Sequence, residues 1–113
     1  MLLPCEIIVN YLLPAVRSRT IRILSKKHGF TQVQIAEALG LTQAAVSKHL
    51  SFKYTDKINK ISKEKEVEKI ADKLAKKVAD GAGKDEVIES ICKGCITLKS
   101  KGLIKKINKE FAS

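Results

Sequence analysis

Apolar side chains recur at helical spacing through the first part of the chain, and two prolines divide that pattern. Pro4 fits the first position of a helix. Pro14 either breaks the hydrogen-bond ladder or starts a second helix, because proline has no N–H and clashes with the preceding turn. The apolar stripe then runs to the basic residues 26–28, and Gly29 is predicted to end the helix.

Two short helices are predicted next, each with its own start signal. Thr31 and Gln34 form a capping-box pattern, in which each side chain binds the backbone N–H of the other residue. Gly40 is expected to end this helix in a left-handed conformation, and Thr42 to cap a second helix over 42–51. Because so short a step separates the two helices, they cannot lie antiparallel and must cross steeply.

The second half of the chain predicts two longer amphipathic helices, over 63–79 and 85–101, and a short final helical segment. The expected inner face of the later long helix includes Ile88, Cys92 and Cys95. Residues 51–62 are predicted to form a loop or hinge with about one helical turn. Both apolar stripes are wider than two isolated helices can hide, so they must pack on the first part of the chain or on a second copy.

Composition supports an all-α fold. The 113 residues are 44% hydrophobic but only 4% aromatic, with no tryptophan, and strands favour aromatic side chains. The expected organisation is an N-terminal helical domain over 1–55 and a helical C-terminal region over 56–113 that packs or dimerises.

Charge is distributed differently in the two parts, although each has a net charge of +5. Residues 1–55 hold seven basic side chains and only two acidic ones, whereas the remainder holds 15 basic and 10 acidic ones. A mixed Lys/Glu surface is typical of a solvated helix face. An uncompensated positive surface attracts a polyanion, although solubility alone also explains it.

No export or membrane signal is expected. The apolar stretch 1–16 has no basic segment before it, is interrupted by polar residues and prolines, and falls short of the roughly 18 apolar residues of a membrane span. Three cysteines are an odd number and too few for a disulfide scaffold, so a reducing compartment is expected. The protein is therefore predicted to be soluble and cytoplasmic, with no membrane partner.

The most informative window begins at Gln32. Counting from it, Ala36 is fifth, Gly40 ninth, Val46 fifteenth and Leu50 nineteenth, which resembles the helix-turn-helix signature of prokaryotic repressors. Ala36 must be small because the second helix crosses over it, and Val46 and Leu50 belong to the apolar wedge that fixes the crossing angle.

The second helix then turns short polar side chains outward, toward a DNA major groove. Gln43 is suited to adenine, Ala44 to a thymine methyl group, and Lys48 to guanine or a phosphate. N–H groups at the two helix starts are suited to phosphates. The residues expected to contact DNA are Thr31, Gln32, Thr42, Gln43, Ala44, Ser47, Lys48, Ser51 and Lys53.

Residues 1–55 are therefore predicted to form a helix-turn-helix DNA-binding domain. The resulting prediction is a sequence-specific transcriptional regulator that inserts the helix 42–51 into double-stranded DNA as a homodimer. The alternatives are an antitoxin-like protein-interaction adaptor and a nonspecific architectural DNA binder. No enzyme is expected, because no nucleophile–base or paired-carboxylate arrangement is visible. No cofactor is expected, and no pattern indicates a pocket for a small-molecule effector.

Several neighbouring residues allow two interpretations. Three arginines of the first long helix either flank the duplex or form a solvated face: Arg17, Arg19 and Arg22. His49 is expected to be partly exposed near a phosphate, with a pH switch as the alternative. Lys53 and Tyr54 either anchor the DNA backbone or pack at the hinge.

Three segments add a family resemblance: residues 1–6, residues 13–15 and residues 41–47, which read MLLPCE, LPA and LTQAAVS. They resemble a family of small archaeal predicted transcriptional regulators, strongly over residues 1–51 and more weakly beyond. The resemblance implies an all-α, dimeric DNA-binding protein. Some relatives carry a further domain similar to thiamine-phosphate synthase, which these 113 residues do not include.

The pair Cys92 and Cys95 allows three interpretations: packing, redox chemistry, or half of a zinc site with Cys5 as a further candidate ligand. Packing is favoured because both residues fall on an apolar stripe, where cysteine behaves as a small hydrophobe. Family relatives follow this pair with another Cys and a His, but 102–108 holds neither residue type. No metal site is therefore predicted.

Overall fold

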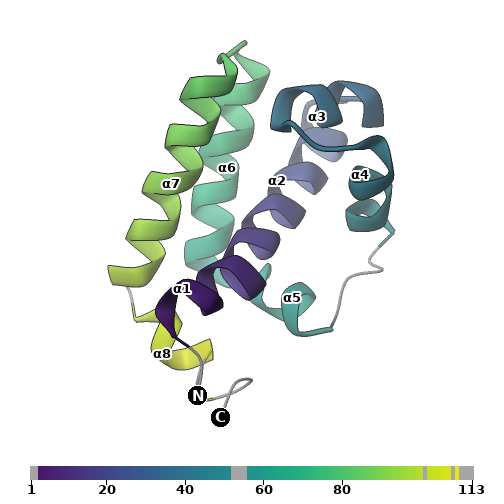
Figure 1. Ribbon diagram of the computed structural model, residues 1–113. Helices are drawn as coiled ribbons and strands as arrows, with labels where there is room; N and C mark the ends of the chain where they lie inside the picture. Colours follow the sequence, from purple (N-terminus) through teal and green to yellow (C-terminus); the bar gives the residue numbers. More distant parts are fainter. Residues whose placement is uncertain (1–2, 52–55, 101, 108, 110–113) are drawn as a thin grey trace.

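The computed structural model describes residues 3–51, 56–100, 102–107 and 109, and every regular element in these ranges is helical (Figure 1). The prediction of an all-α protein is confirmed for this part of the chain. In chain order the helices are α1 (Pro4–Ile7), the π-helix η1 (Ile8–Leu12), α2 (Leu13–Lys27), α3 (Gln32–Leu39), α4 (Gln43–Leu50), α5 (Asp56–Ile61), α6 (Lys65–Ala79), α7 (Lys84–Ser100) and α8 (Leu103–Ile107).

Helix α2 runs diagonally through the middle of the molecule, between the α6–α7 pair and the short helices α3 and α4 (Figure 1). Its most extensive packing is against α6. One buried apolar cluster joins both halves of the chain and includes Leu24 of α2, Ile35 of α3, Val46 of α4 and Ala71 of α6. The apolar stripe of α6 is therefore covered by the N-terminal half of the same chain.

Pro14 neither ends a helix nor begins one, because Leu12 and Leu13 before it already have right-handed helical dihedral angles. It lies in the first turn of α2, directly after the π-helical turn η1. The preceding turn is widened into η1, and the N–H of Leu13 donates to the carbonyl of Ile8, five residues back. The chain thus stays helical across the proline, and Gly29 then adopts a φ of 67° beyond the end of α2.

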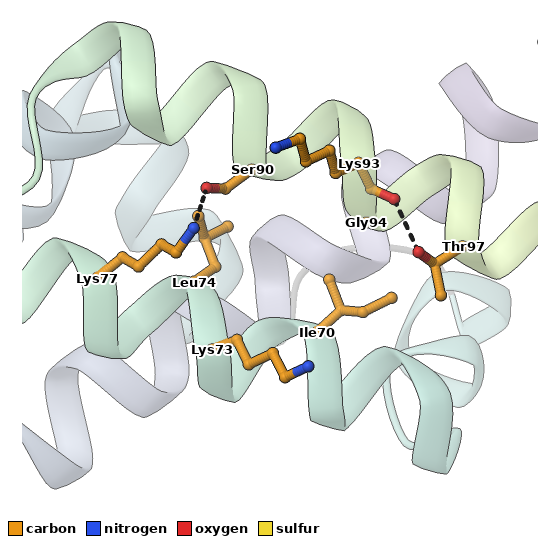
Figure 2. A pocket seen from close by; sticks show the side chains of 8 residues that line it. All are labelled: Ile70, Lys73, Leu74, Lys77, Ser90, Lys93, Gly94 and Thr97. Atoms are coloured by element: carbon orange, nitrogen blue, oxygen red, sulfur yellow. Dashed lines mark hydrogen bonds between the residues drawn. The ribbon is translucent and has the colours of Figure 1, made fainter.

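Helices α6 and α7 approach closely because Gly94 has no side chain. A Cβ atom at this position would lie 2.6 Å from Cγ2 of Ile70, closer than two carbon atoms tolerate. Figure 2 shows Ile70 beside Gly94, and Lys77 reaching across to Ser90 with a hydrogen bond of 3.1 Å. A small hollow of about 260 Å³ remains between the helices.

Two predictions for the second half need correction. Residues 51–62 contain more helix than a single turn, since α5 (Asp56–Ile61) buries Ile58 and Ile61. On α7, Cys95 is buried as expected, but Ile88 is 59% exposed and Cys92 is exposed as well. The apolar stripe of α7 is wider than the surface that the neighbouring helices cover, so part of the stripe stays exposed. Across the part of the chain described, every helix is too short or too polar to traverse a lipid bilayer.

Candidate nucleic-acid interface

The start and end of α3 follow from three local signals, and all three predictions are confirmed. The hydroxyl of Thr31 accepts a hydrogen bond from the N–H of Gln34 at 3.2 Å, while Oε1 of Gln34 accepts one from the N–H of Thr31 at 2.9 Å. Gly40 then ends the helix with φ 67° and ψ 32°. This left-handed conformation excludes a straight helix through Gly40 and redirects the chain into α4.

Helix α4 is held by its cap and by one buried side. Oγ1 of Thr42 accepts a hydrogen bond from the N–H of Ala45 at 3.1 Å, which satisfies a donor that the helix itself cannot. Val46 is fully buried and Leu50 half-buried, and the helix packs against α2. Figure 1 places α4 at the edge of the molecule opposite α7.

The outward side of α4 carries most of the residues that the sequence predicts to contact DNA. Residues at 43, 44, 47, 48 and 51 fall on one face because of their helical spacing. The exposed members of the predicted set are Thr31, Thr42, Gln43, Ala44, Ser47, Lys48 and Ser51. Gln32 is half-buried, and Lys53 and Tyr54 lie outside the described residues.

Hydrogen bonds within the chain determine which hydroxyls on this surface can still donate to a ligand. Ser51 donates its hydroxyl proton to the carbonyl of Ser47 at 2.8 Å, so its oxygen remains an acceptor only and is unsuited to a phosphate. Thr31 and Thr42 use their oxygens as acceptors in capping, which leaves their hydroxyl protons for a ligand.

The electrostatic surroundings favour an anion. Glu37 is the one acidic residue between positions 31 and 51, and it lies on α3. Lys48 is exposed on the outward face of α4, in its last turn. Side chains of this kind, with few acids nearby, are suited to phosphates and to the edges of base pairs.

The prediction of a partly exposed His49 is wrong. Its side chain is 2% exposed, because residue 49 lies three positions after Val46 and shares its buried side. Burial, followed by the nearby charges of Arg22, Arg17 and Lys48, lowers the pKa of His49 to about 4. The imidazole is therefore neutral at physiological pH and lies on the side of α4 that packs against α2.

Two of the three arginines of α2, Arg19 and Arg22, are directed differently from either prediction, while Arg17 is half-buried. Arg22 is 6% exposed and donates hydrogen bonds to Oδ1 of Asn59 at 3.1 Å and to Oγ of Ser62 at 3.4 Å. Arg19 forms an ion pair with Glu68 of α6 at 3.2 Å. Both side chains thus connect α2 to the C-terminal half of the chain instead of standing in solvent.

The cysteines do not come together as a ligand set. Among the described residues no group of three or more His, Cys, Asp or Glu side chains is placed to hold a metal ion. Cys5, Cys92 and Cys95 are all free thiols, and burial raises the pKa of Cys95. Cys95 therefore stays a protonated, packed side chain.

Comparisons of the chain with protein-family models, with curated proteins and with solved structures gave no match.

Proposed function

We propose that the protein is a sequence-specific DNA-binding transcriptional regulator that inserts α4 into the major groove as a homodimer. The observation that carries the proposal is the division of α4 into two sides. Val46 and His49 fix one side against the core, while short polar side chains and Lys48 occupy the exposed side. A helix fixed in this manner presents its outer residues to base edges without reorganising.

Each exposed residue has a distinct role in this proposal. Gln43 recognises adenine through two hydrogen bonds, and Ala44 contacts a thymine methyl group. Thr31 and Thr42 donate to phosphates at the two helix starts, which places both helices on the DNA backbone. Lys48 supplies salt-dependent affinity.

The dimer in this proposal uses the exposed stripe of α7. Ile88 and Ile96 are 59% and 67% exposed, and the exposed Cys92 lies midway between them. Residues four apart lie on nearly the same side of a helix, so the three form a continuous apolar stripe on successive turns. Large exposed apolar side chains in a row are typical of a protein-interaction surface.

The charges that flank the stripe suit a second copy of the same chain. Asp85 and Lys99 lie seven residues before and after Cys92, on the same side of α7. In an antiparallel pair of α7 helices related by a twofold axis at Cys92, Ile88 meets Ile96 of the other copy. Asp85 then meets Lys99, so both ends of a contact about 21 Å long are charge-complementary.

Selection from a random pool of duplex DNA tests the proposal. The expected result is enrichment of one sequence, with an affinity that falls steeply as salt rises because Lys and Arg contacts release counterions. An architectural DNA binder would enrich no sequence. A protein-interaction adaptor would bind DNA weakly and without salt dependence, and either result would contradict the proposal.

A further inference from the structure

A second cationic site lies on α2, apart from the exposed face of α4. It is an open hollow of about 400 Å³ at the junction of α2 with the segment that leads into α6. We call it the basic hollow. Its lining residues are Arg19, Arg22, Ile23, Lys26, Lys27 and Lys63.

Both arginines of the basic hollow are held in place before any ligand binds. Arg22 is 6% exposed, and Asn59 and Ser62 accept hydrogen bonds from its guanidinium nitrogens. Ser62 is itself anchored, since its hydroxyl donates to the carbonyl of Asn59 at 2.7 Å. Glu68 fixes Arg19 from the side of α6. Guanidinium groups that are already oriented lose little freedom on binding an oxyanion.

Positive charge exceeds negative charge around the basic hollow. None of its lining residues is acidic, and two of its cations pair with carboxylates: Arg19 with Glu68, and Lys27 with Asp72 at 3.5 Å. Within the described ranges, Lys26 and Lys63 form no ion pair. Burial and the neighbouring Arg19 lower the pKa of Arg22, and a bound anion would act in the opposite direction.

The segment that leads into α6 contributes Lys63 to the basic hollow. Lys63 directly precedes the N-cap residue Glu64, whose side chain makes no capping hydrogen bond and instead pairs with Lys106 at 2.7 Å. Glu66 and Glu68 lie in the first turn of α6, so the helix start itself carries negative charge and the cations of the hollow come from α2 and Lys63.

We propose that the basic hollow binds the phosphate group of a small phosphorylated molecule, with the organic part of the ligand against Ile23. A phosphate has several acceptor oxygens and up to two charges, which suits donors that converge from helix α2 and the segment between α5 and α6. A carboxylate accepts in one plane and fits this set less well. The volume exceeds that of a free phosphate, and Ile23 supplies an apolar wall.

This site does not depend on DNA binding, so it is tested without DNA. The full chain is titrated by isothermal calorimetry, in chloride buffer, with inorganic phosphate, ribose 5-phosphate and succinate. We expect ribose 5-phosphate to bind most tightly and the Lys26→Ala/Lys63→Ala double variant to bind it about tenfold more weakly. Both lysines are exposed, so the variant should fold, which thermal unfolding verifies.

A double variant that also removes two positive charges serves as the control. Lys73→Ala/Lys84→Ala removes one ammonium group from the other hollow, between α6 and α7 (Figure 2), and one from the start of α7. This control should bind ribose 5-phosphate as the unchanged chain does. The proposal is overturned if the control loses binding, if the Lys26→Ala/Lys63→Ala variant keeps it, or if succinate or inorganic phosphate binds as tightly as ribose 5-phosphate.

Discussion

Helices α4 and α7 each leave one side exposed, yet the two exposed sides differ in chemistry. The exposed side of α4 carries mostly short side chains, one lysine and no acidic residue. The exposed side of α7 combines large apolar side chains with charges of both signs. The first kind of surface is suited to the polyanionic backbone and base edges of DNA, and the second to another protein helix. Exposure alone therefore does not indicate the partner; the size and charge of the exposed side chains do.

The largest effect is expected on α7. The double change Ile88→Lys/Ile96→Lys places four lysines in the proposed dimer contact and should raise the dimer dissociation constant by about 100-fold or more. Sedimentation equilibrium measures this constant. Val9→Lys, at a 61% exposed apolar residue of η1, is the matched control and should leave it unchanged. A chain that is monomeric before any substitution would contradict the proposed dimer.

The buried side of α4 should make stability depend on pH. His49 has a pKa of about 4 in the folded protein and an ordinary value of 6.5, so the unfolded chain binds the proton more tightly. The free energy of unfolding should therefore fall by about 2.5 kcal/mol as pH decreases from 6.5 to 4, and this contribution is fully present well above pH 6.5.

Urea unfolding at several pH values provides the measurement. His49→Gln should flatten the profile between pH 4 and 6.5, whereas His28→Gln, at the exposed histidine, should keep it. Equal slopes in both variants would show that His49 does not stabilise α4 as a neutral side chain.

On the exposed side of α4, Lys48→Ala should weaken DNA binding by about tenfold on all sequences, if Lys48 contacts a phosphate. The slope of log affinity against log salt should decrease by about one. Lys84→Ala, at the start of α7, makes the same charge change away from the proposed DNA surface and should alter neither quantity. Fluorescence anisotropy at several salt concentrations measures both quantities. An equal loss of DNA affinity in the two variants would contradict a DNA contact that is specific to α4.

A smaller effect is expected at the cap of α4. Thr42→Ala removes the acceptor for the N–H of Ala45 and should lower the free energy of unfolding by about 1 kcal/mol. Thr97→Ala, within α7, removes a hydroxyl that only donates to the carbonyl of Lys93, and should change stability by less than about 0.5 kcal/mol. Chemical denaturation compares the two, and equal costs would show that the cap does not stabilise α4.

The sequence predicted those parts of the fold that depend on neighbouring residues. The capping box at Thr31, the left-handed Gly40 and the cap at Thr42 each require only a few adjacent positions, and all three are confirmed. Val46 was predictable as a buried residue for the same reason, because helical spacing defines the inner side of a short helix.

Contacts between distant segments were not predictable in this way. The spacing of Arg19 and Arg22 showed that they share a side of α2, but not that Arg22 binds Ser62, forty residues later. Lys63 joins them only because the chain returns to α2 before α6 begins. His49 was misplaced for a related reason, since its burial depends on how closely α4 lies against α2.

The central claim is that the exposed side of α4 recognises base pairs, and Gln43→Ala tests it most directly. The unchanged chain and the variant are each taken through selection from the same random duplex pool, and their preferred sites are compared. The proposed orientation of α4 predicts that the variant loses discrimination at one base pair, by about 1–3 kcal/mol, and keeps it elsewhere. An identical preferred site in both proteins would contradict it.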